Sequence, residues 1–170
     1  MKTKRLIVCA LFTAIICIVA PFCVMVGPVP ITLTLFALAL SAFVQGSSMG
    51  AVSTFVYILI GIVGLPVFSS FRGGVSILAA PTGGFVISYV FVVLILGRCK
   101  NAKKKSHIIM LCAMALAVCY TFGIVWYMLV TKCHITTALM LCVVPFVPFD
   151  IVKLYLAYKV SKEIKKKTML

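Results

Sequence analysis

The chain has 170 residues, of which 64% are hydrophobic and 11% charged, and its formal net charge is +14. A soluble domain cannot bury so much apolar surface, whereas a lipid bilayer solvates it, so the composition excludes an ordinary soluble protein. The apolar stretches are long and continuous, which favours membrane-spanning helices over the alternating strands of a membrane barrel. We therefore expect an all-α integral membrane protein that forms one domain over residues 1–170.

Six spans are predicted in chain order. Residues 6–71, 73–97 and 106–131 contain no Asp, Glu, Lys or Arg, and the first of these runs far exceeds a single span of about 20 residues. The basic start and apolar core resemble a signal peptide, but no convincing cleavage site precedes Pro21, so we interpret this segment as a retained first span. Turn residues divide the chain into spans at 6–25, 31–44, 50–64, 83–97, 107–130 and from 148 into the Lys-rich tail.

The last span allows two interpretations, because Pro145 and Pro148 interrupt the apolar run that begins at Ile135. Proline suits the first turn of a helix and breaks its interior. In the first interpretation the span begins near Pro148, and residues 135–146 form a shorter membrane-associated element. In the second, one longer span begins at Ile135 and is kinked at the prolines. We favour the first.

The basic residues predict the orientation of the spans. Thirteen of the sixteen Lys and Arg residues lie before the first span, between the fourth and fifth, or in the C-terminal tail, and these positions share one side of a six-span protein. By the positive-inside rule both termini are cytoplasmic, and the Gly-rich loop 65–81 between the third and fourth spans lies outside. We therefore attribute the positive charge to topology at anionic headgroups and not to nucleic-acid binding.

Several classes of function have no support in the residue patterns. The eight cysteines form no C-x-x-C pair and lie mostly in apolar runs, where Cys is a small packing residue. Neither a metal site nor a cofactor site is therefore predicted. The chain also lacks a recognisable nucleophile–base set and any nucleotide-binding motif, which argues against an enzyme and against ATP hydrolysis by this chain.

The strongest candidate site residues are Asp150 and Lys153. Asp150 and Glu163 are the only acidic residues in the chain, and Asp150 lies three residues before Lys153, so a helix places both on one face. Ionisable groups at membrane depth are costly and usually face each other, a cavity or a ligand. The pair is therefore either an internal ion pair that fixes helix packing or a binding site for a polar ligand, aided by the free N–H groups of the helix start. The pattern alone does not choose between these.

Weaker candidates lie in the outer loop and in the first span. Gly73, Gly74, Gly83 and Gly84 would let the backbone approach a ligand, although a tight loop needs such glycines too. Arg72 could supply a cation to a site or be a solvated charge. Ala10 and Ala14 have the small-x-x-x-small spacing that permits close helix approach, which is common by chance in Ala-rich membrane chains.

Four segments, taken in order, resemble the BioY family of biotin-specific S components of energy-coupling-factor (ECF) vitamin importers. They cover nearly the whole chain and read Gly27-Pro28-Val29-Pro30-Ile31-Thr32-Leu33, Gly61-Ile62-Val63-Gly64-Leu65-Pro66-Val67-Phe68, Pro81-Thr82-Gly83-Gly84-Phe85 and Pro148-Phe149-Asp150-Ile151-Val152-Lys153. The resemblance implies a multi-pass subunit of the cell membrane that captures biotin from outside for ATP-driven uptake.

The resemblance also assigns roles to the candidate residues. It implies that Asp150 and Lys153 hold biotin, and from charge we infer that Lys153 meets the carboxylate and Asp150 the ureido N–H groups. The Gly-rich loop would close over the ligand. The small-residue motif, matched by Ala10 and Ala14, would dock on a transmembrane coupling subunit, and two ATPase subunits would supply the energy.

Three positions depart from the family pattern. Thr34 stands where family members often have Gln, Val86 follows Gly83-Gly84-Phe85 where some members have a cation, and Arg72 replaces a smaller polar residue. We hypothesise that Arg72 partly replaces the missing cation, and the ligand could be a biotin relative. A self-sufficient carrier that needs no ATPase partner is the alternative function, and a structural membrane protein is a third hypothesis.

Overall fold

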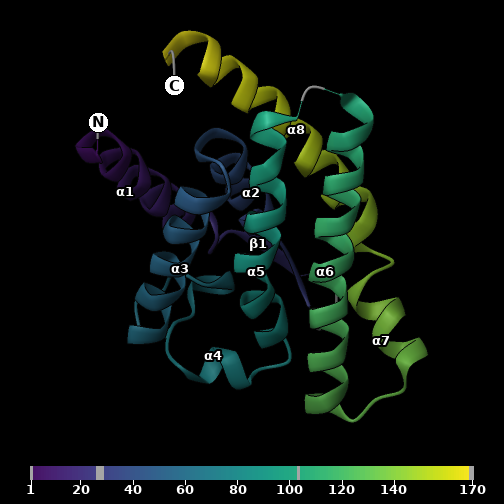
Figure 1. Ribbon diagram of the computed structural model, residues 1–170. Coiled ribbons are helices and arrows are strands. Elements are labelled where there is room, and N and C mark those ends of the chain that lie inside the picture. Colours follow the sequence, from purple (N-terminus) through teal and green to yellow (C-terminus); the bar gives the residue numbers. More distant parts are fainter. Residues whose placement is uncertain (1, 26–28, 103, 169–170) are drawn as a thin grey trace.

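The computed structural model describes residues 2–25, 29–102 and 104–168, and this part of the chain is mostly helical (Figure 1). The elements in order are α1 (Lys2–Val19), β1 (Cys23–Met25), β2 (Pro30–Thr32), α2 (Thr34–Gln45), α3 (Ser47–Val63), η1 (Ser69–Phe71), α4 (Ser76–Ala79), α5 (Gly83–Leu96), η2 (Gly97–Asn101), α6 (Lys105–Thr131), α7 (Ile135–Cys142) and α8 (Phe146–Thr168).

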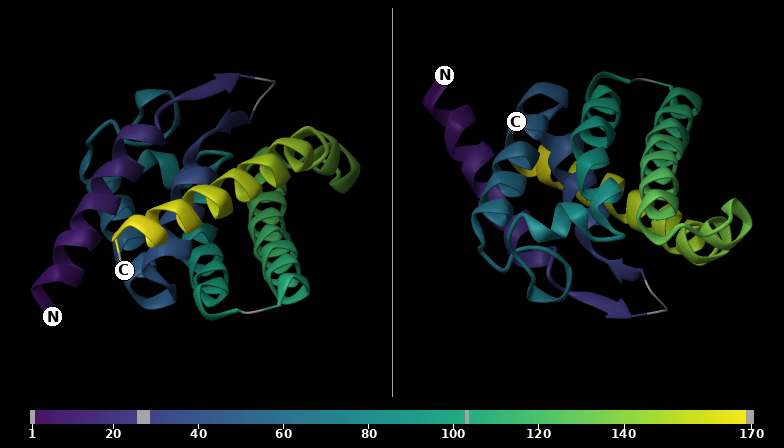
Figure 2. Two further views of the ribbon diagram at one scale, coloured as in Figure 1. Left: turned by 90° about the horizontal axis from the view of Figure 1, so that it is seen from above. Right: turned by 90° about the horizontal axis from the view of Figure 1, so that it is seen from below.

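Helix α2 lies at the centre of the core. It contacts α1, α3, α5 and α8, and the side chains of Leu38, Ala39 and Ala42 are fully buried. Figure 2 shows α8 crossing the bundle obliquely, where the small side chain of Ala157 is also fully buried. Small residues at such crossings let helices approach closely, which in lipid is a main source of packing energy.

The predicted bounds of the first two spans are wrong where the two spans adjoin, because residues 23–25 and 30–32 form short strands there. Helix α1 ends at Val19, and residues 23–25 form β1, which pairs antiparallel with β2 in the register Cys23↔Thr32, Val24↔Ile31 and Met25↔Pro30. The helix ends there because Pro21 has no N–H to donate and restricts the residue before it. The predicted turn at 27–30 lies partly outside the described residues, while Pro30 begins β2 and α2 starts only at Thr34.

The number of spans is only partly supported by helix length. Residues Gly83–Asn101, which comprise α5 and η2, and Lys105–Thr131 of α6 are each long and apolar enough to cross a bilayer. Helices α7 and α8 pass the same test as a pair bent by 41°. Helices α2 and α3 are apolar but shorter, at 12 and 17 residues. The molecule is a membrane protein by these features, and its six-span arrangement remains a prediction.

The last segment forms two helices, as in the favoured interpretation, but only the bent pair of α7 and α8 together is long and apolar enough to cross a bilayer, as in the second interpretation. Helix α7 ends at Cys142, and α8 begins as a separate helix at Phe146, between the two prolines. Pro148 lies in the first turn of α8, where its missing N–H leaves no helical hydrogen bond unmade. The bend thus separates the apolar α7 from the helix that carries the acidic and basic candidates.

The basic segments gather at one end of the molecule. Figure 1 shows the start of α1, the end of α8 and the connection between α5 and α6 together at this end, with α4 at the opposite end. The predicted loop at 98–106 is partly helical, since η2 occupies Gly97–Asn101 and α6 begins at Lys105. The clustering agrees with the grouping of basic residues on which the predicted orientation rests.

Candidate functional site

A cavity of about 160 Å³ is lined in part by the 65–82 loop, which lies at the end of the molecule opposite the basic segments (Figure 1). Its walls come from the β1–β2 hairpin, the 65–82 loop, and helices α2, α5, α6 and α8. Most of the lining is apolar, and a smaller group of lining residues carries polar or charged side chains: Thr32, Ser69, Ser70, Arg72, Thr82, Tyr89, Cys119, Tyr120, Asp150 and Lys153. An apolar cavity with a few convergent polar groups is typical of a small-molecule site.

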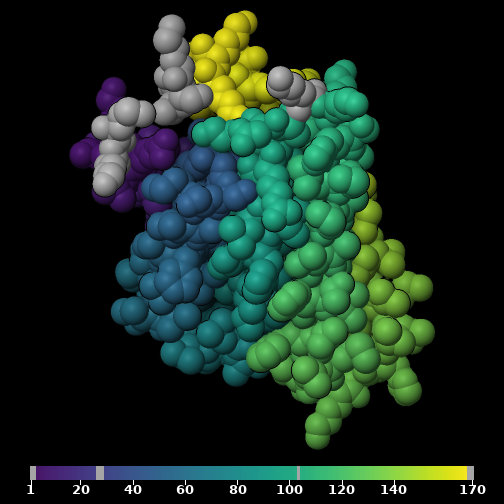
Figure 3. Space-filling model, in the orientation of Figure 1, coloured from purple at the N-terminus to yellow at the C-terminus, as the bar shows by residue number. Residues whose placement is uncertain are grey.

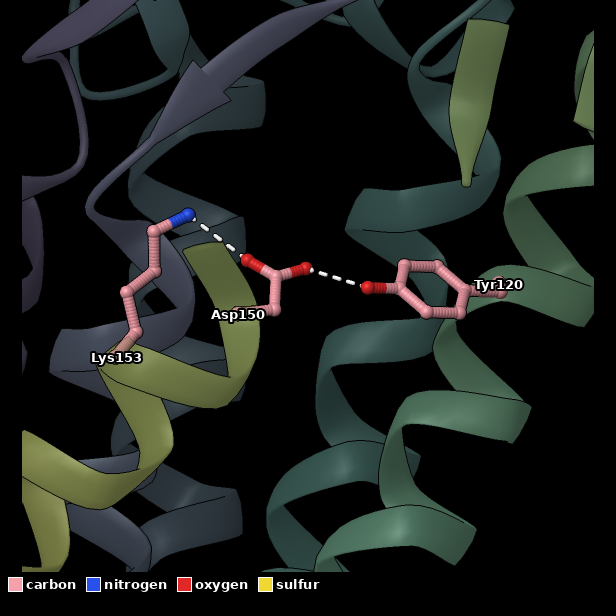
Figure 4. Close-up of polar contacts among 3 residues, drawn as sticks. All are labelled: Tyr120, Asp150 and Lys153. Atoms are coloured by element: carbon pink, nitrogen blue, oxygen red, sulfur yellow. Dashed lines mark hydrogen bonds and ion pairs between the residues drawn. The ribbon is translucent and has the colours of Figure 1, made fainter. Parts of the chain in front are cut away.

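Asp150 and Lys153 form the charged centre of the cavity. Lys153 Nζ lies 2.8 Å from Asp150 Oδ1, and the two residues are 6% and 8% exposed. The Tyr120 hydroxyl donates to Asp150 Oδ2 at 2.9 Å. Figure 4 shows Tyr120 reaching across from α6 towards the carboxylate, while Asp150 and Lys153 project from the same face of α8. The carboxylate is therefore held from both sides, by a cation and by a phenol.

The start of α8 positions this pair but offers little additional anion binding. The backbone N–H groups of Phe146 and Val147 both donate to Val143 O, at 2.9 and 3.1 Å, and Pro148 has no N–H. Most first-turn donors that could have bound a ligand are therefore used or missing. The anion-binding capacity near Asp150 comes instead from cationic side chains.

Arg72 is the second cation on the cavity wall, and it comes from the 65–82 loop. Within the described ranges its guanidinium is in no ion pair, since Asp150–Lys153 is the one salt bridge found there. The loop is anchored at Arg72 and just before it. Phe68 N–H donates to Arg72 O at 2.9 Å, and Ser70 N–H donates to Pro21 O at 3.0 Å. An anchored loop with an unpaired cation presents a ready partner for an anionic ligand group.

None of the four candidate glycines lines the cavity, and three of them, Gly73, Gly83 and Gly84, have packing roles. A Cβ on Gly73 would meet the carbonyl oxygens of Leu65 and Gly64, and one on Gly83 would meet that of Leu78. A Cβ on Gly84 would meet Trp126 and the carbonyl of Phe122, where α5 packs on α6. Gly74 has φ +98°, a conformation that glycine tolerates best.

Ala10 and Ala14 lie apart from the cavity, exposed on α1. Their neighbours Ile7, Leu11 and Ile18 are also exposed, so an apolar stripe runs along this helix. Such a stripe faces lipid or another membrane helix.

Sequence reasoning missed Tyr120 and Tyr89, which line the cavity from α6 and α5. A signal for Tyr120 existed, because a tyrosine inside an apolar span needs a hydrogen-bond partner and Asp150 is one of only two carboxylates. The segment that forms α6 is apolar on all faces, however, so its sequence does not show which face packs against α8. No cluster of three metal-ligating side chains occurs among the residues that the structure describes.

Comparison with known proteins gives consistent results. The model of the BioY family matches residues 1–169. The protein named biotin transporter BioY from Thermotoga maritima is 34% identical over 165 residues, covering 96% of each chain. The probable biotin transporter BioY from Pyrococcus horikoshii is 34% identical, covering 99% of this chain and all of that one. A crystal structure titled as the S-component for biotin from an ECF-type ABC transporter shares the fold, with a TM-score of 0.88, 24% identity, and coverage of 98% and 93%.

Proposed function

Because the chain belongs to the BioY family, we propose that it captures biotin from outside the cell as the substrate-binding subunit of an ECF-type importer. Its relatives are named as transporters, not as enzymes. The observation that carries the proposal is the buried Asp150–Lys153 pair, which faces a mostly apolar cavity instead of being sealed in the core. A charged pair kept at membrane depth beside an empty volume is expected at a polar ligand site.

The geometry of the pair revises how biotin would bind. The ureido ring and the carboxylate of biotin are separated by the valeryl chain, whereas the charged atoms of Asp150 and Lys153 are 2.8 Å apart. An extended biotin therefore cannot place its two ends on these two side chains separately. We propose that the ureido ring meets Asp150 and Lys153 together and that the carboxylate meets Arg72.

The three residues around Asp150 have complementary roles in this arrangement. Lys153 and Tyr120 each donate one hydrogen bond to the carboxylate of Asp150. The carboxylate therefore keeps free lone pairs that can accept from the ureido N–H groups of biotin. Lys153 retains further N–H donors that can reach the ureido oxygen. The apolar wall, which includes Leu35, Phe68 and Phe146, suits the sulfur ring and the methylene chain.

Uptake would need partners, because no nucleotide-binding motif is present in this chain. We propose a six-span arrangement with cytoplasmic termini in the cell membrane, in which the exposed Ala10–Ala14 stripe of α1 docks on a transmembrane coupling subunit. Two ATPase subunits would then supply the energy. The support for this part is the family itself and the exposure of both alanines.

Biotin calorimetry on the purified chain in detergent tests the proposal, with Lys153→Ala and Lys132→Ala in parallel. Saturable binding to wild type and Lys132→Ala, lost in Lys153→Ala, is expected. A folded wild-type chain that binds no biotin would overturn the assignment.

Liposome uptake with and without the coupling and ATPase subunits tests the transport step. We expect uptake of biotin only when all subunits are present. Full uptake by this chain alone would contradict the role of partners.

A further inference from the structure

A second groove lies at the basic end of the molecule, between α1, the junction of α2 and α3, and η2. Its volume is about 500 Å³, and it shares no lining residue with the candidate biotin cavity. Figure 3 shows α1 lying against the α2–α3 segment at the end of the molecule where α8 also ends. The proposed biotin function makes no use of this groove.

Three cations from two distant segments converge on the groove. Lys4 and Arg5 come from the first turns of α1, and Lys100 comes from η2. Lys100 Nζ donates to Gln45 O at the end of α2, at 3.3 Å, and retains its other N–H donors. The groove therefore concentrates positive charge at a meeting point of elements that are far apart in sequence.

Among the residues that the structure describes, these cations have no acidic partner. Of the chain's two carboxylates, Asp150 is paired with Lys153, and Glu163 lies on α8 in a different groove that α8 alone forms. Three neighbouring cations repel one another, so an external anion would lower the electrostatic energy. Negative charge bound in this groove would therefore come from another molecule.

The rest of the groove wall is mostly apolar, which restricts the kind of anion. Val8, Val44 and Met49 line it beside Gln45 and Ser48. A free phosphate or a nucleic acid would leave this surface unused. A molecule with a phosphate and acyl chains would use both parts.

We propose that this groove binds the headgroup of one anionic phospholipid, with the phosphate on Lys4, Arg5 and Lys100 and the start of an acyl chain against Val8 and Met49. Basic pockets between membrane helices are known to hold anionic headgroups, and each Lys or Arg near such a surface contributes about 1 kcal/mol. The bound lipid would bridge α1 to η2 and hold the start of α1 against the α2–α3 junction. The site is independent of biotin.

Native mass spectrometry of the delipidated full chain tests the site, by titration with palmitoyl-oleoyl phosphatidylglycerol and, separately, with the zwitterionic phosphatidylcholine of the same chains. We expect one phosphatidylglycerol to bind with clear preference. The variant K4Q/R5Q/K100Q should weaken the binding of that lipid on the order of 100-fold, as the loss of three cations implies.

The matched control is R98Q/K104Q/K105Q, which removes the same number and kind of exposed cations from the same end of the molecule without touching the groove lining. Retained phosphatidylglycerol binding in this control supports a defined site. Equal losses in the two triple variants, equal binding of the two lipids, or competition by millimolar glycerol phosphate would overturn the proposal. Unchanged biotin affinity in both variants shows that the fold is intact, so this result is separate from the test of the proposed function.

Discussion

The hydroxyl of Tyr120 on α6 donates a 2.9 Å hydrogen bond to the carboxylate of Asp150 on α8, thirty positions further along the chain. This contact joins the two helices at the one buried carboxylate that the structure describes, and Lys153 completes the set at 2.8 Å. Three polar groups thus satisfy one another on the wall of a mostly apolar cavity. Each can be changed separately, which makes their roles measurable.

Tyr120→Phe should weaken biotin binding while leaving the protein folded. The variant removes one hydrogen bond to a charged acceptor, a contribution of roughly 1.5–3 kcal/mol, so we expect on the order of a 10-fold loss of affinity in calorimetry. Tyr155→Phe is the matched control, because Tyr155 lies on α8 with 57% exposure and outside the cavity. Equal affinity of the two variants would show that Tyr120 does not support the site.

The Asp150–Lys153 pair should contribute to folding and to binding in separable ways. Lys153→Met leaves a buried unpaired carboxylate, which costs about 3–5 kcal/mol in comparable sites, so the thermal unfolding midpoint in detergent should fall sharply. The double variant D150N/K153M removes both charges and should recover much of that stability without recovering biotin binding. Normal biotin affinity in the double variant would show that the pair has a structural role and no role in binding.

Arg72→Gln should weaken binding of biotin but not of biotinamide, which lacks the carboxylate charge. A hydrogen-bonded charge contact contributes roughly 1.5–3 kcal/mol, so we expect at least about a 10-fold loss for biotin alone. Lys132→Gln removes an exposed cation at the end of α6 and should change neither affinity. Parallel losses for both ligands in Arg72→Gln would place the carboxylate elsewhere.

Gly84→Ala should destabilise the protein with little effect on the biotin affinity of the folded fraction. The added Cβ would meet Trp126 and the Phe122 carbonyl where α5 packs on α6, and overpacking of this kind costs about 1–3 kcal/mol. Ala113→Val adds volume at an exposed position of α6 and serves as the control. A stable Gly84→Ala variant that fails to bind biotin would instead support the ligand role predicted from the sequence.

Ala10→Trp and Ala14→Trp should leave biotin binding intact and reduce uptake by the assembled importer several-fold or more. Both alanines are exposed on α1, so a large side chain fits on the isolated chain but obstructs close approach of another helix. Ile109→Trp, at an exposed position of α6, controls for a bulky residue facing lipid. Normal uptake by the two alanine variants would remove α1 from the docking surface.

Features that depend on local composition and spacing could be predicted without the structure. Continuous apolar runs require a membrane protein, and the three-residue spacing requires Asp150 and Lys153 to share a helix face, since the helical period alone decides this. The separation of α7 from α8 followed from the chemistry of proline. Resemblance to the BioY family rested on short motifs, and the family comparison confirmed it.

The tertiary structure decided which faces of these helices meet. Helices α5 and α6 are apolar almost all round, so their periodicity cannot identify the face that packs inward, and Tyr120 could not be assigned to Asp150. The packing role of Gly84 and the convergence of Lys4, Arg5 and Lys100 likewise depend on contacts between distant segments. The β1–β2 hairpin was missed because its residues are as apolar as the helices beside it, and hydropathy does not distinguish a short apolar strand from the end of a span.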